Sequence, residues 1–264
     1  MSKVLIQEKT LTDIADAIRE KTNTTALIDP ATFAEKQTEV FEAGKKAQYD
    51  IFWDTYQNEG KGGNYDFAFA GQGWTTVTFK PTKDIKPARA QYIFSQTAIK
   101  GDLVALCEKL GIVIDFSNCK LFNSFTSNAR GITRFGVIDV SKATDTFTFI
   151  NCVALITIDK LIVSATTKYS SAAFEGDTNL ENLIVEGEIA QNNFNTRYCT
   201  KLSKASIESV INCLSTDTTG LIVTFSQASV DKAFETSEGA ADGSTSAEWL
   251  ALKATKSNWQ VDLK

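Results

Sequence analysis

The sequence predicts an α+β repeat protein, in which a solenoid with a narrow parallel sheet follows N-terminal helices and precedes a C-terminal α/β cap. A column of phenylalanines, a column of aspartates and a change of pattern at both ends lead to this prediction. The phenylalanines are separated by 25, 31, 24, 25 and 20 residues. Self-similarity at such a period indicates short units that bury their apolar faces only by stacking. The column consists of Phe69, Phe94, Phe125, Phe149, Phe174 and Phe194.

A second apolar column follows the phenylalanines by five to eight residues and supports the same period. It consists of Trp74, Ile99, Ile132, Leu155, Leu180 and Leu202. Asp84, Asp115 and Asp139 each stand ten residues before a phenylalanine of the column. Stacked units would bring these carboxylates to about 5 Å from one another, which suits a ladder of cations. We favour the alternative, in which each aspartate accepts backbone N–H groups at a turn, because no Asp/Asn-rich calcium motif accompanies them.

The predicted strands of the repeat region are short apolar runs. They cover residues 112–116, 137–140, 161–163 and 183–185. Each would add one strand to a narrow parallel sheet, with the phenylalanines stacked inside. The long gap between Phe94 and Phe125 contains residues 101–111, which we expect to form a short helix that ends at a glycine.

Two helices are predicted before the repeats. Residues 10–22 keep one apolar face, and a longer helix begins at Asp29-Pro30 and extends to about Gln57. We favour packing of its apolar side, either on the end of the repeats or on a sister subunit. The alternative is that it forms a coiled-coil seam. We predict that the apolar residues of both helices mediate oligomerisation or docking. They are Leu11, Ile14, Ile18, Phe33, Val40, Phe41, Ala47 and Ile51.

A different pattern begins at Ser203 and predicts a compact cap. We expect a helix over 204–214, a strand over 221–225, a helix over 228–235 and a strand over 259–263. Thr245 and Glu248 resemble a capping box for a helix that ends near Thr255. Trp249 and Trp259 would fill this cap. The predicted domains are therefore an attachment segment at 1–57, the repeats at 58–202 and the cap at 203–264.

Aromatic residues crowd around the glycine-rich loop at 59–64. We interpret them as a plug that covers the open first unit of the repeats. The alternative is that some of these rings are exposed and stack on sugars.

Composition excludes several classes of protein. The net charge is −5 with scattered Lys and Arg, so no nucleic-acid partner is expected. No apolar run approaches the roughly 18 residues of a membrane span, and the polar start does not resemble a signal peptide. Histidine is absent and the five cysteines form no C-x-x-C pair, so we predict buried thiols, no metal and no cofactor. Glu186 and Glu188 form a carboxylate pair on one predicted strand face, which we interpret as a solvated edge. We therefore expect no catalytic residues and no enzyme activity.

Two stretches resemble known families. The runs Asp115-Phe-Ser-Asn-Cys119, Asp139-Val-Ser-Lys-Ala143 and Cys152-x-x-Leu155 resemble BspA-like leucine-rich repeats of gut bacteria and their phages, over about residues 64–202. This resemblance implies a leucine-rich-repeat-like solenoid. Leu11-Thr-Asp-Ile-Ala-Asp-Ala-Ile-Arg-Glu-Lys-Thr22, with Leu27-Ile-Asp-Pro30 and Phe33-Ala-Glu-Lys36, resembles the leader of tail-associated proteins of phages and prophages in Gram-positive hosts.

Together these resemblances imply a structural protein of the virion, assembled in the host cytoplasm. They imply a tail fibre, tail tip or baseplate protein whose repeats bind a glycan or protein on the host surface. Symmetric assembly as a homotrimer is expected, with the N-terminal helices contacting other virion proteins. The alternatives are a head fibre or decoration protein and a bacterial leucine-rich-repeat surface adhesin.

Overall fold

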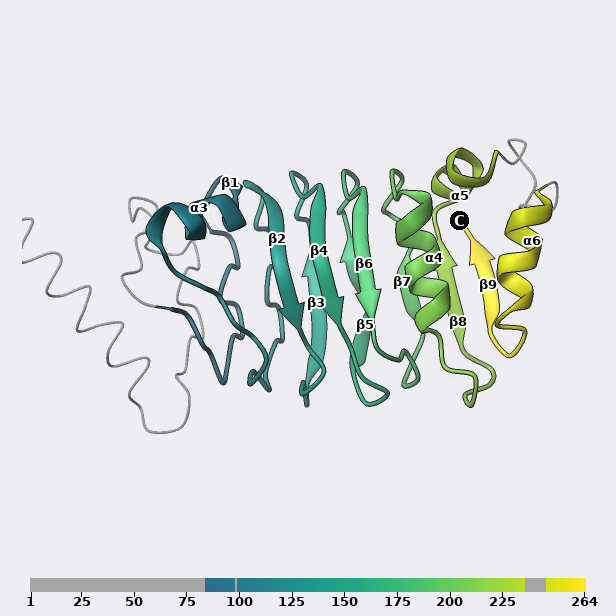
Figure 1. Ribbon diagram of the computed structural model, residues 1–264, viewed down its shortest axis with the longest axis horizontal. Helices are drawn as coiled ribbons and strands as arrows, with labels where there is room; N and C mark the ends of the chain where they lie inside the picture. The colour runs from purple at the N-terminus through teal and green to yellow at the C-terminus, as the bar shows by residue number, and fades with distance from the viewer. Residues whose placement is uncertain (1–83, 98, 236–245) are drawn as a thin grey trace, which may run out of the picture. The chain divides into compact units, whose positions relative to one another are not determined.

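The computed structural model describes residues 84–97, 99–235 and 246–264 (Figure 1). All of them belong to the unit Tyr56–Lys264, one of two into which the chain divides. The predicted attachment segment and the aromatic residues around the loop at 59–64 lie outside the described residues. The elements are β1 Gly101–Asp102, α3 Leu103–Leu110, β2 Ile132–Asp139, β3 Thr146–Ile150, β4 Thr157–Ile162, β5 Lys168–Glu175, β6 Asn182–Glu186, β7 Phe194–Thr196, α4 Lys204–Cys213, β8 Ile222–Phe225, α5 Gln227–Phe234, α6 Ala247–Ala254 and β9 Gln260–Leu263.

The predicted leucine-rich-repeat-like solenoid with one narrow parallel sheet is wrong as a fold class. The described residues form a mixed α/β structure with three parallel sheets, ordered β1-β2-β4-β6, β3-β5 and β7-β8-β9. Figure 1 shows β3 and β5 behind β2, β4 and β6. The prediction placed the phenylalanines behind a single sheet. Phe149 and Phe174 instead lie within strands β3 and β5, because runs such as Thr146-Phe-Thr-Phe-Ile150 combine β-branched and aromatic residues, which favour extended backbone.

The period of the sequence nevertheless determines which residues are neighbours across a sheet. Phe135 of β2 pairs with Ile158 of β4, and Ile158 pairs with Leu183 of β6. In the second sheet Phe149 pairs with Phe174, and their rings are stacked with centroids 5.9 Å apart. Each strand therefore pairs with the equivalent strand of the next repeat.

The core of the repeat region lies between its two sheets and includes the two apolar columns. Phe94, Phe125 and Phe149 are fully buried, and Phe174 and Phe194 are at most 1% exposed. Rings from the two sheets meet directly, since the centroids of Phe135 in β2 and Phe149 in β3 are 5.4 Å apart. The second column is buried as well, at Ile99, Ile132, Leu155, Leu180 and Leu202. Stacking of repeats is what buries both columns.

Helix α3 confirms the helix predicted in the long gap. Asp102 caps its N-terminus, because its Oδ1 accepts a hydrogen bond from the backbone N–H of Ala105 at 3.0 Å. Gly111 ends it in the left-handed conformation, with φ of 65°. The helix packs on β2 at Gly136, where an added Cβ atom would lie 3.2 Å from the side chain of Val104. A bare backbone at this position lets the helix approach the sheet.

Helix α4 takes the place of the next strand beside β6. Ser206 Oγ accepts a hydrogen bond from the Leu183 N–H at 2.9 Å, and Ser209 Oγ accepts one from the Val185 N–H at 3.2 Å. The thiol of Cys213 donates to the Val185 carbonyl. The helix thus satisfies with side chains the backbone groups that another strand would have paired.

The C-terminal cap agrees closely with the prediction. Helices α4 and α5 and strands β8 and β9 begin and end within one residue of the predicted limits. Trp249 is fully buried and Trp259 is 5% exposed, so both fill the cap. The predicted capping residue of α6 is wrong: Ser246, one residue after Thr245, accepts the hydrogen bond from the Trp249 N–H. Thr245 itself lies outside the described residues.

Candidate functional site

The predicted oligomerisation or docking residues all precede the part of the chain that the structure describes. Leu11, Ile14, Ile18, Phe33, Val40, Phe41, Ala47 and Ile51 therefore lie outside the described residues and stay a prediction. Among the residues from 84 onward that are described, no helix has the length and apolarity to cross a membrane. A candidate site must be sought on the repeats and the cap.

Asp115 and Asp139 bind the backbone of turns, as the turn interpretation predicted, whereas Asp84 binds the backbone of a segment 29 residues away. Asp115 Oδ1 accepts the N–H of Ser117, and Asp139 Oδ1 accepts the N–H of Ser141, each at 2.9 Å. Asp84 Oδ1 accepts the Val113 N–H at 2.9 Å. Hydrogen bonds from Ser117 are the main reason that the pKa of Asp115 lies below its usual value. Within the described ranges, no three His, Cys, Asp or Glu side chains are grouped so that they could hold a metal ion.

The predicted placement of Glu186 and Glu188 on one strand face is wrong. Glu186 is the last residue of β6, and its carboxylate is 2.6 Å from the ammonium group of Lys160 on β4. Gly187 follows with φ of 103°, a conformation that turns the chain away from the strand. Glu188 lies beyond this turn. Only Glu186 therefore belongs to the strand, which is not visible in a period-two reading of the sequence.

The described cysteines are free thiols, and four of the five are buried. Burial is the main cause that raises the pKa of Cys107 to about 11, and it raises the pKa of Cys152 and Cys199 as well. A thiol is a nucleophile or a metal ligand only as thiolate. The prediction of buried structural thiols is confirmed for Cys107, Cys119, Cys152 and Cys199.

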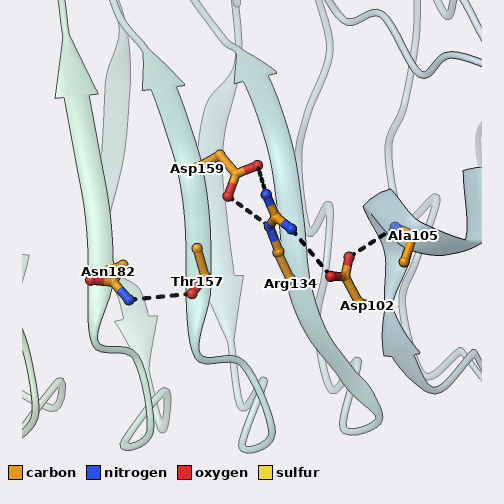
Figure 2. Close-up of polar contacts among 6 residues, drawn as sticks. All are labelled: Asp102, Ala105, Arg134, Thr157, Asp159 and Asn182. Carbon is orange, nitrogen blue, oxygen red and sulfur yellow. Dashed lines mark hydrogen bonds and ion pairs between the residues drawn. The ribbon is translucent and has the colours of Figure 1, made fainter. Parts of the chain in front are cut away.

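A ladder of polar side chains crosses the sheet β1-β2-β4-β6 and forms the candidate site (Figure 2). The guanidinium group of Arg134 on β2 binds Asp159 on β4 through two hydrogen bonds, from Nε and Nη2, each of 2.8 Å. Its Nη1 lies 3.3 Å from Asp102 Oδ2 on β1. One cation therefore ties together three strands.

Asp102 has two tasks in this ladder. One carboxylate oxygen caps α3 and the other binds Arg134, so the ladder also joins the helix to the sheet. The two carboxylates, Asp159 first, raise the pKa of Arg134 above its usual value, and the guanidinium stays charged. The side chains remain accessible, at 41% for Arg134, 31% for Asp159 and 34% for Asp102. The ladder is therefore ordered but open to solvent.

Further side chains extend this surface over β4 and β6. The amide of Asn182 donates to the Thr157 hydroxyl at 3.4 Å, and Lys160 pairs with Glu186. Val137 lies beside Lys160 in the strand register and is 49% exposed. We call this surface the sheet face. It comprises Asp102, Arg134, Val137, Thr157, Asp159, Lys160, Asn182 and Glu186.

The chemistry of the sheet face is suited to binding. Its charges are in contact with charges of opposite sign, Arg134 with two carboxylates and Lys160 with Glu186. Three of the five N–H donors of Arg134 are used by the two carboxylates, which leaves two for a ligand. The Asn182 amide, the Thr157 hydroxyl and the Lys160 ammonium group lie on the same face and offer further fixed hydrogen-bonding positions.

The sequence patterns did not single out the sheet face, although a signal exists. Arg134 and Asp159 are 25 residues apart, and Asp102 and Arg134 are 32 apart. These separations are close to the local spacing of the phenylalanine column. Opposite charges at the repeat spacing could therefore have been recognised as neighbours on adjacent strands.

Comparison with models of protein families, with curated proteins and with solved structures finds no match to this chain. The sheet face and the N-terminal sequence patterns are therefore the features from which a function can be inferred.

Proposed function

We propose that the chain is a non-enzymatic structural protein of a phage virion, carried on the tail in a fibre, tail tip or baseplate, and that its sheet face binds the host cell surface. The ordered polar ladder on an exposed sheet is the observation that supports binding. The likeness of residues 11–36 to the leader of phage tail-associated proteins supports the place in a virion.

Preorganisation is the physical argument for a binding role. The Arg134 guanidinium is fixed by two carboxylates on neighbouring strands, so a ligand would immobilise few additional rotatable bonds when it binds. The face combines charged pairs, an amide, a hydroxyl and an exposed valine. This mixture suits a polar ligand with small apolar patches, such as a surface glycan or the polar surface of a host protein.

The N-terminal segment would supply attachment and multiplicity. Its predicted apolar faces would join three copies and dock them on other virion proteins. Several sheet faces on one appendage would strengthen a weak single contact by avidity, about 100-fold or more. A modest affinity for each sheet face is therefore sufficient in this proposal.

The test compares two valines that are similarly exposed on different surfaces. Val137 on the sheet face is 49% exposed, and Val153 in the turn after β3 is 41% exposed. Fluorescently labelled full-length protein and its Val137→Glu and Val153→Glu variants are incubated with a panel of Gram-positive bacteria, and bound protein is measured by flow cytometry. We expect Val137→Glu to reduce binding at least tenfold and Val153→Glu to leave it unchanged.

Two outcomes would contradict the proposal. Wild-type protein that binds none of the strains would remove the host-binding role and favour a decoration role on the head. Strong binding that survives both Val137→Glu and Asn182→Lys would show that another surface contacts the host. Circular dichroism of each variant checks that the substitutions leave the fold intact.

A further inference from the structure

Asp177 is a buried carboxylate for which the proposed function has no use. It lies in the turn between β5 and β6 and is 0% exposed. Its Oδ1 accepts the backbone N–H of Cys152 at 2.7 Å. Its Oδ2 has no hydrogen-bond partner among the described residues.

The surroundings of Asp177 offer no compensating positive charge among the described residues. The Cys152 N–H donates a hydrogen bond to it, and two ionisable groups interact with it, the thiols of Cys152 and Cys199. Burial and the nearby carboxyl raise the pKa of both thiols, so they stay neutral. Asp177 therefore has two neutral thiols near it, and one of its oxygens has no hydrogen-bond partner among the described residues.

Removing a carboxylate from water without a counter-ion is strongly unfavourable, whereas a neutral carboxyl group is tolerated. We infer that Asp177 is a protonation switch in the core: it is neutral in the tightly packed fold, and its ionisation weakens the packing between two successive repeats. The switch is independent of the proposed function, because it concerns the stability of the stack and not what the stack binds.

The switch acts where two turns meet. The Asp177–Cys152 hydrogen bond joins the turn after β5 to the turn after β3. The adjacent Gly176 is packed so tightly that an added Cβ atom would lie 2.2 Å from the Asn151 side chain. Water cannot reach the carboxylate unless these turns separate. Ionisation therefore favours a state in which the turns have opened.

The sign of the pH dependence follows from burial. Desolvation raises the pKa of Asp177 from 3.8 to about 7, since the single hydrogen bond from Cys152 only partly opposes it. Between these values the unfolded chain loses a proton that the folded chain retains. The unfolding equilibrium constant should then rise by up to about tenfold per pH unit from about pH 4 to about pH 7 and level off above that. Most paired surface carboxylates have the opposite effect.

The experiment measures unfolding of the full chain in urea between pH 5 and pH 8.5. The wild type should unfold more easily as the pH rises, by at least tenfold in the equilibrium constant. Asp177→Asn should lack this change, because the asparagine side chain has nearly the same shape and carries no charge. Asp139→Asn is the matched control, because Asp139 also accepts one backbone N–H but is only half-buried. It should keep the wild-type slope.

A wild-type stability that is flat over this range, or a slope that Asp177→Asn retains, would overturn the inference. If Asp177→Asn does not fold, a measurement on the wild type tests the inference. The carbon-13 resonance of the Asp177 carboxyl group should titrate with a midpoint above pH 6, and a midpoint below pH 4.5 would contradict the switch. Amide exchange at Cys152, corrected for its intrinsic pH dependence, should accelerate through the same range.

Discussion

At the scale of single residues, Arg134 is the side chain on which the sheet face depends. Removing it would leave Asp102 and Asp159 as two uncompensated carboxylates on either side of β2 and would remove three hydrogen bonds. All three side chains are partly exposed, so water would offset much of the loss. A cost of about 1–2 kcal/mol is expected for Arg134→Ala.

Urea unfolding of Arg134→Ala beside Arg130→Ala measures this cost. Arg130 is exposed in a turn, and its hydrogen bond to Asn128 is long at 3.5 Å, so its removal should change the free energy of unfolding by less than about 0.5 kcal/mol. Adding Asp159→Asn to Arg134→Ala should restore part of the loss, because it removes one of the repelling charges. Equal effects of the two arginine variants would show that the ladder contributes nothing to stability.

At the scale of elements, the end of the sheet at β6 depends on two serines of α4. Ser206→Ala together with Ser209→Ala would leave the N–H groups of Leu183 and Val185 without acceptors. An unsatisfied buried group costs about 1–3 kcal/mol. Helix propensity alone predicts the opposite sign, because alanine is favoured over serine inside a helix. The sign of the change therefore distinguishes the two effects.

We expect the double variant to be less stable than the wild type by about 2–4 kcal/mol in urea unfolding. The amides of Leu183 and Val185 should exchange faster with solvent. Asn212→Ala, on the exposed side of the same helix, is the control and should be neutral or slightly stabilising. A double variant as stable as this control would mean that the serines do not seal the edge of β6.

At the scale of the whole molecule, the number of copies is the open prediction. We expect full-length protein to be a trimer, and Ile14→Asp with Ile18→Asp to dissociate it, since charges on an apolar seam are incompatible with a buried interface. Mass photometry of the wild type, this double variant and the control Asp16→Lys gives the answer. A wild-type monomer would indicate instead that the segment docks on a different protein.

Local signals in the sequence were sufficient to predict the helices whose ends are set by capping residues. Asp102 and Gly111 bound α3, and Ser203 caps α4, because caps and left-handed glycines act within a few residues. The second sheet was not predicted, because Thr146-Phe-Thr-Phe-Ile150 spans only five residues. Such a run does not reveal whether it forms a strand or packs as a turn until its partner is known.

The spacing of the phenylalanines along the chain was enough to establish the period, and with it the equivalent residues and two apolar columns that belong to the core. The tertiary structure was needed to show that Phe149 and Phe174 belong to strands of a second sheet, whereas Phe94 and Phe125 lie in turns. It also decided that Arg134 meets two carboxylates and that Asp177 is enclosed without a counter-charge. The physical reason is that a repeat specifies which residues stack, whereas burial and partners depend on the path of the chain between the stacked positions.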